Sequence, residues 1–148
     1  MGSTGVAAIF AFCAGLGGAV QIAVQTRLGD RVGSVEALAC AAIVSAICAT
    51  TVVLVARGGF GRVGAGFSGP KWQLLGGVMS AVIVLSITVA GPRIGTVATT
   101  AILIAGQFAL ATVIDRNGWF GVTPVAISWQ RLLGLALLAA GAVLVLRR

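Results

Sequence analysis

Five apolar stretches dominate this sequence, and each is long enough to cross a lipid bilayer as a helix. A hydrocarbon core about 30 Å thick is crossed by about 20 helical residues, because each residue adds about 1.5 Å of rise. The stretches cover residues 6–26, 35–56, 72–90, 94–114 and 125–146. They occupy most of the 148 residues and leave only short loops. We therefore predict an all-α integral membrane protein with five transmembrane helices in a single membrane domain, residues 1–148.

The composition supports this fold class and excludes several others. Hydrophobic residues make up 59% of the chain and charged residues only 9%, whereas soluble domains carry about 25% charged residues. The stretches are too long and too uniformly apolar for barrel strands, which alternate in polarity over about ten residues. The chain has no His and only three acidic residues, and it lacks nucleotide-binding and hydrolase motifs. We therefore expect neither an enzyme nor a cofactor.

Glycine and proline mark the connections between the spans, and tryptophan marks the ends of the spans. The turn Gly91-Pro92-Arg93 is so short that spans three and four are expected to form a tight antiparallel hairpin. The longest loop, residues 57–70, is rich in Gly and is expected to be flexible, without a binding motif. The three tryptophans fall at predicted span ends, as in the aromatic belts of membrane proteins: Trp72, Trp119 and Trp129.

The three cysteines all fall within predicted spans and lack the spacing of a metal or redox motif. They are Cys13, Cys40 and Cys48. We interpret them as small apolar residues and expect no metal site.

The formal net charge of +7 gives no usable signal for orientation in the membrane. Five spans place the termini on opposite sides, and the ten Lys and Arg residues divide equally between the two sides. One side carries Arg57, Arg62, Lys71, Arg116 and Arg131, and the other carries Arg27, Arg31, Arg93, Arg147 and Arg148. Cations scattered in this way do not favour nucleic-acid binding.

The balanced charge instead favours insertion in both orientations. Two opposed copies would form an inverted pair, equivalent to the inverted repeats inside many transporters, whose substrate site lies near the midplane. We therefore predict an antiparallel homodimer. The alternative is that packing or a partner fixes one orientation despite the balanced charges.

Few polar residues lie within the spans, and these are the candidates for a binding site. Gln21 and Gln25 are four residues apart and share one face of the first helix, while Gln107 lies midway along the fourth span. Amides in hydrocarbon are costly unless paired, so they should face other helices or a wet cavity. Interhelical hydrogen bonding and substrate binding both explain them. The candidate substrate-binding residues are Gln21, Gln25, Gln107, Gly17, Gly106 and Ser80.

Charged residues occur only near the span ends. Glu36 begins the second span, Asp115 ends the fourth, and Arg131 lies near the start of the fifth. Asp115 and Arg131 flank one loop, at a spacing that allows them to pair. These three residues are either ordinary interfacial charges or elements of coupling and gating. Because no carboxylate occupies the middle of a span, Na⁺ is as suitable a coupling ion as H⁺.

An ordered series of short motifs resembles the YdcZ-type family of the drug/metabolite transporter superfamily. Residues 21–29 are similar to its QxxxNxxL start, with Gln25 in place of the usual Asn, and Ala46 and Cys48 replace the usual Phe and Gly. Further similar segments follow in order: Lys71-Trp72 before Gly76-Gly77, residues 91–95, residues 105–107, Ile114-Asp115 before Gly118, and Ser128 with residues 131–134 before Gly141.

The resemblance implies a five-helix, half-size transporter of the bacterial inner membrane that works as a pair. The overall plan is similar to that of small multidrug resistance proteins, which exchange protons for cations at a membrane-embedded Glu in their first helix. The first helix here carries Gln21 and Gln25 instead. The antiport mechanism is therefore not carried over.

We expect a secondary transporter of a small polar or amphipathic metabolite or drug-like compound, with a midplane site in a dual-topology homodimer. Its expected partners are a second copy, the substrate and the plasma-membrane lipid. The alternatives are a passive channel built on the same dimer, one subunit of a heteromeric transporter, and a membrane subunit that transports nothing itself.

Overall fold

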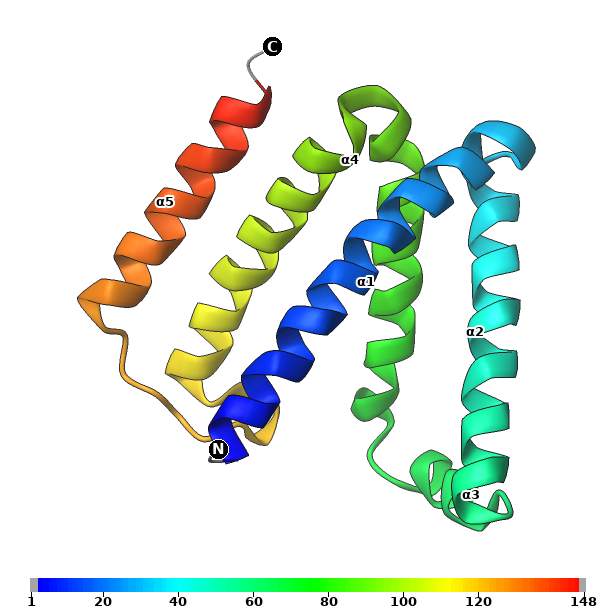
Figure 1. Cartoon of the computed structure of the whole chain (residues 1–148). Coiled ribbons are helices and arrows are strands. Elements are labelled where there is room, and N and C mark those ends of the chain that lie inside the picture. Colours follow the sequence, from blue (N-terminus) through cyan, green and yellow to red (C-terminus); the bar gives the residue numbers. More distant parts are fainter. Residues whose placement is uncertain (1–2, 147–148) are drawn as a thin grey trace. The chain divides into compact units, whose positions relative to one another are not determined.

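The computed structural model describes residues 3–146, and every regular element in that range is helical (Figure 1). The elements are α1 (Ser3–Val32), α2 (Ser34–Arg57), α3 (Gly61–Ser68), η1 (Lys71–Leu74), α4 (Leu75–Asn117), η2 (Trp119–Gly121) and α5 (Trp129–Leu146). In this range, four helices are long and apolar enough to cross a membrane: α1, α2, α4 and α5. The prediction of an all-α integral membrane protein is confirmed.

Helix α4 covers the fourth predicted span and all of the third except residues 72–74, which belong to η1. Its 43 residues would extend about 65 Å at 1.5 Å per residue, about twice the thickness of a bilayer core. The helix is interrupted at Gly95, whose φ of 81° and ψ of 164° are non-helical. The five separate spans and the tight hairpin between spans three and four stay predictions.

The position of this break differs from the one expected from Gly91-Pro92-Arg93. Pro92 remains inside the helix, although an interior proline removes one backbone hydrogen bond and crowds the preceding turn. The chain leaves the helix three residues later, where Gly95 has no Cβ to oppose a positive φ. Glycine, and not proline, is therefore the residue at which α4 is interrupted.

Helix α5 begins at Trp129, four residues later than the predicted span 125–146. Residues 122–128 have no regular secondary structure. Pro124 follows two β-branched residues in this segment, a composition that disfavours helix. The helix starts where Ser128 Oγ accepts a hydrogen bond from the Arg131 backbone N–H at 3.4 Å, which is the arrangement of an N-cap.

The long loop between α2 and α4 was expected to be a flexible connection, and this expectation is wrong in part. Residues Gly61–Ser68 form the eight-residue helix α3. The helix starts with hydrogen bonds from the N–H groups of Val63 and Gly64 to the carbonyl of Phe60. Glycine is a poor helix former, so the three glycines of this short segment concealed the helix in the sequence.

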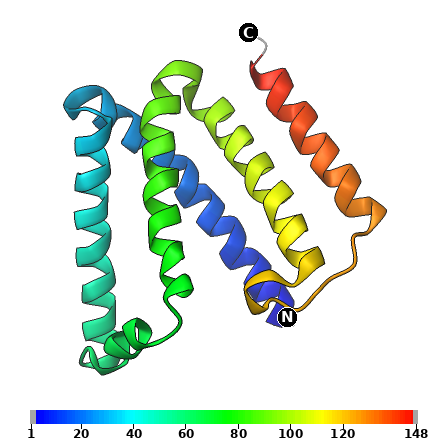
Figure 2. The same ribbon diagram turned by 180° about the vertical axis from the view of Figure 1, so that it is seen from behind.

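The chain divides into two compact units, and α1 and α4 contribute to both. The first unit combines the chain up to Val20 with the chain from Arg93 onwards, and the second is Gln21–Pro92. Within the second unit, α2 runs beside the first part of α4, as both views show (Figures 1 and 2). Within the first unit, the later part of α4 runs beside α5 (Figure 2). The single membrane domain stays a prediction.

Small residues allow the end of α1 to approach α4 closely within the second unit. A Cβ atom added at Gly29 would lie 3.2 Å from Thr88 Cβ, and one added at Gly91 would lie 3.0 Å from Thr26 Cβ. Thr88 is only 2% exposed, and its hydroxyl donates to the Leu85 carbonyl at 2.8 Å. Close backbone approach at glycine is the usual means of helix packing in membranes.

Candidate functional site

A cleft of about 130 Å³ lies in the second unit, between residues of α1, α2 and α4. Its polar side chains come one from each helix: Gln21 from α1, Ser45 from α2 and Ser80 from α4. The remaining lining residues are apolar or small: Leu38, Ala41, Ala42, Gly77, Ala81 and Val84. A site that is mostly apolar with a few polar groups is the usual composition of a small-molecule site.

The sequence creates this cleft by placing small residues at helical spacing on the helices that line it. Ala41 and Ser45 are four residues apart on α2, and Gly77 and Ala81 are four apart on α4. Residues at this spacing share a helix face. Because these side chains are short, they leave room between the helices. Ser45 lies near the middle of α2, so the cleft is close to midspan on that helix.

The three polar side chains of the cleft have no hydrogen-bond partner in the part of the chain that the structure describes. All three are exposed. Other hydroxyls in the same unit bond their own helix, as Ser86 does with the Val82 carbonyl and Thr51 with the Ile47 carbonyl. Polar groups without partners are unfavourable in an apolar environment. The cleft therefore presents an amide and two hydroxyls that are available to a ligand or to water.

Gln25 lies one turn beyond Gln21 but has a different environment. Its side chain is buried, with the residue only 6% exposed. Its Nε2 donates a hydrogen bond to the Ala37 carbonyl at 2.8 Å, which joins α1 to α2. Ala37 itself is fully buried. The contact favours interhelical hydrogen bonding over substrate binding for Gln25.

The candidate residues thus fall into separate groups. Gln21 and Ser80 lie together in the cleft. Gly17, Gly106 and Gln107 belong to the first unit and are exposed; their part in substrate binding stays a prediction. Ser45 was not among the candidates, because serine in a membrane helix commonly bonds its own backbone. Its spacing from Ala41 was the signal that would have identified it.

The predicted pairing of Asp115 with Arg131 is confirmed in the first unit. Arg131 Nη1 donates to Asp115 Oδ2 at 3.0 Å, and the two side chains are 36% and 34% exposed. The backbone of the same loop is held by a hydrogen bond from the Val125 N–H to the Asp115 carbonyl, 2.8 Å long. Glu36 is exposed in the first turn of α2, where a negative charge is favourable. Roles for these residues in coupling or gating stay predictions.

Comparison with known proteins identifies the family. Residues 6–144 match the family model described as "Putative inner membrane exporter, YdcZ". Neither the curated proteins nor the solved structures give a match. The family match covers nearly the whole chain and agrees with the long apolar helices. The chain therefore belongs to the YdcZ family, and it is a multi-pass transporter of the inner membrane.

Proposed function

We propose that the chain is a secondary transporter that moves a small polar or amphipathic metabolite or drug-like compound without altering it chemically. The observation that carries this proposal is the cleft beside the middle of α2, where Gln21, Ser45 and Ser80 lack hydrogen-bond partners within residues 3–146. An amide both donates and accepts hydrogen bonds, as do two hydroxyls. Such a set suits an uncharged polar group or the polar end of an amphipathic molecule.

The size of the cleft supports a site shared between two copies of the chain. Its volume of about 130 Å³ is smaller than the roughly 300–1,000 Å³ of typical small-molecule sites. One copy can therefore enclose only a polar end group of the substrate. In the antiparallel homodimer that we propose, the second copy supplies an equivalent cleft and encloses the rest.

We further propose five membrane crossings, with the break at Gly95 dividing α4 into two. Two opposed copies can exchange conformations during alternating access, because each copy is the inverted equivalent of the other. The coupling ion is H⁺ or Na⁺. The pair Asp115–Arg131 is the proposed gating element at one membrane face, and Glu36 is a further coupling candidate.

The central experiment is a solute screen on the purified full-length protein, read as a shift in its unfolding temperature. A ligand that binds only the folded state raises that temperature. A solute found in this way should be transported by proteoliposomes, and both its binding and its transport should weaken in Gln21→Leu. Binding without transport would contradict the transporter function. Voltage-driven flux that does not saturate would favour a channel.

The orientation of the chain is tested separately. In a variant without Cys13, Cys40 and Cys48, single cysteines placed at either terminus are labelled in intact cells with a membrane-impermeant thiol reagent. Dual topology predicts partial labelling at both termini. Complete labelling at one terminus and none at the other would exclude it.

A further inference from the structure

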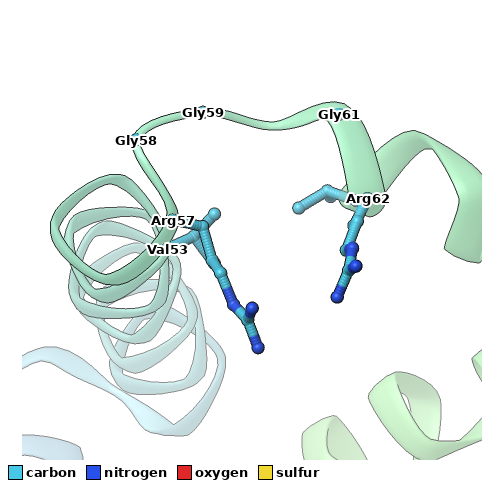
Figure 3. A pocket seen from close by; sticks show the side chains of 7 residues that line it. Val53, Arg57, Gly58, Gly59, Gly61 and Arg62 are labelled. Atoms are coloured by element: carbon cyan, nitrogen blue, oxygen red, sulfur yellow. The ribbon is translucent and has the colours of Figure 1, made fainter.

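A second cavity lies in the connection between α2 and α4, away from the proposed transport cleft. It has a volume of about 550 Å³, and it is lined by the last turn of α2, the glycine-rich turn that follows and the start of α3. Two arginines flank it. Arg57 closes α2 and Arg62 lies in the first turn of α3 (Figure 3).

The two guanidinium groups point into the same space. Figure 3 shows both side chains extending in the same direction from opposite ends of the Gly58–Gly61 turn. The turn is sharp because Gly58 adopts a left-handed conformation, with φ of 68°, and its N–H bonds the Leu54 carbonyl. This turn brings together two arginines that are five residues apart in the sequence.

Nothing in the surrounding sequence neutralises these charges. Residues 57–71 contain Arg57, Arg62 and Lys71 but no acidic residue. Neither Arg57 nor Arg62 forms an ion pair within the described range 3–146. Arginine presents a planar fork of donors that matches phosphate oxygens. The cavity therefore has the charge and the donors to bind a phosphate group.

Helix α3 adds an apolar surface beside the arginines. Val63 and Phe67 are four residues apart and share a face, while Arg62 lies on another. Phe60, just before the helix, is 48% exposed and Phe67 is 70% exposed. A short helix with basic and aromatic sides is typical of segments that lie in the membrane interface.

The neighbouring elements favour a position for α3 at the depth of the lipid headgroups. It connects the end of one membrane helix, α2, to the start of another, α4. Trp72 in η1 adjoins Lys71, and tryptophan concentrates at the membrane–water boundary. We propose that Arg57 and Arg62 bind the phosphate of an anionic phospholipid, while Phe60 and Phe67 insert into its acyl region. This lipid contact is independent of the transported substrate.

The proposal is tested by lipid binding to the purified full-length protein in a neutral detergent. Phosphatidylglycerol and phosphatidylcholine with identical acyl chains are titrated separately, and the change in unfolding temperature gives an apparent affinity for each. Wild-type protein should prefer phosphatidylglycerol. An arginine near an anionic membrane contributes about 1 kcal/mol, so the double variant R57Q/R62Q should bind phosphatidylglycerol about 30-fold more weakly.

The matched control is R27Q/R31Q, which removes the same charge from the last turns of α1. It should bind phosphatidylglycerol within about threefold of wild type. F60S/F67S should weaken binding of both lipids. Raising the salt concentration should reduce the preference for phosphatidylglycerol, since about 1 M salt shortens the Debye length to about 3 Å.

Three results would overturn the proposal. Equal affinity of wild-type protein for the two lipids would remove the headgroup preference, and unchanged phosphatidylglycerol binding in R57Q/R62Q would remove the two arginines. Equal stabilisation by inorganic phosphate alone would indicate a site for a free anion and not for a lipid.

Discussion

Two neighbouring regions of the second unit place the same kinds of residue in opposite situations. At the packed end of α1, the buried Gln25 side chain donates a hydrogen bond to the Ala37 carbonyl. Gly29 of α1 lies against Thr88 of α4, and Gly91 of α4 lies against Thr26 of α1. One turn earlier, Gln21 faces the cleft with Ser45 and Ser80, and all three lack partners among the described residues. Thr26 is the exception at the packed end, because its buried hydroxyl has no partner in the described chain. The role of a polar residue in a membrane helix therefore depends on its contacts and not on its residue type alone.

The largest effect should come from filling the space at the packed end. Gly91→Leu places a side chain where the Thr26 side chain already lies, so the two helices must separate. Overpacking of this kind typically costs about 1–3 kcal/mol. We expect that loss in the free energy of unfolding, measured by denaturant titration of the purified protein in detergent.

Gly76→Leu is the matched control for this substitution. A Cβ added at Gly76 meets no other atom within 4 Å, and leucine is the better helix former. The control should therefore be as stable as wild type or more so. Equal destabilisation by the two variants would show that the close approach at Gly91 does not hold the packed end together.

The next effect concerns the cleft and ligand affinity. Gln21→Leu removes the only amide of the cleft. A hydrogen bond contributes about 0.5–1.5 kcal/mol, so affinity for the solute found by screening should fall up to about tenfold. Stability should change little, because Gln21 is exposed and makes no side-chain hydrogen bond to another described residue. Isothermal titration gives the affinity, and Gln130→Leu in the first turn of α5 is the control.

Gln25→Leu should give the reverse result, with a smaller effect. It removes the hydrogen bond from Gln25 to the Ala37 carbonyl, which keeps its backbone bond within α2. Interhelical hydrogen bonds in membranes average about 0.6 kcal/mol and reach about 1.7 kcal/mol. We expect a loss of about 1 kcal/mol in the free energy of unfolding, because the lost bond is buried. Ligand affinity per folded molecule should be unchanged. If the Gln25→Leu protein is as stable as wild type but does not bind the solute, Gln25 belongs to the substrate site.

These two glutamines also show what the sequence predicts and what it does not: it predicts their shared helix face, but not their different contacts. Spacing places Gln21 and Gln25 on one face of α1, and no pattern within that helix distinguishes them. The distinction arises from α2, where the turn at Gly33 brings the Ala37 carbonyl within reach of Gln25. By contrast, the apolar lengths alone predicted the membrane helices, since burial in a bilayer depends on composition over about 20 residues.

The breaks between helices were predicted less well, because they depend on backbone conformation at single residues. Gly95 and not Pro92 interrupts α4, and both are plausible from sequence when they lie so close. Helix α3 was missed because Gly61, Gly64 and Gly66 lower its helical propensity. The sequence indicated that Asp115 and Arg131 can pair, because the two residues flank one loop, and the structure contains that pair.

That pair gives the smallest expected effect on stability. Both side chains are about one-third exposed, and ion pairs accessible to water contribute about 0–1 kcal/mol. A double-mutant cycle with Asp115→Asn and Arg131→Gln should therefore yield a coupling free energy of unfolding below about 1 kcal/mol. If the pair gates the transporter, transport in proteoliposomes should change more than this small coupling explains. The charge-reversed double variant, Asp115→Arg with Arg131→Asp, should restore part of that transport, because it keeps the attraction across the loop. Transport that follows stability alone in all these variants would reduce the pair to an interfacial contact.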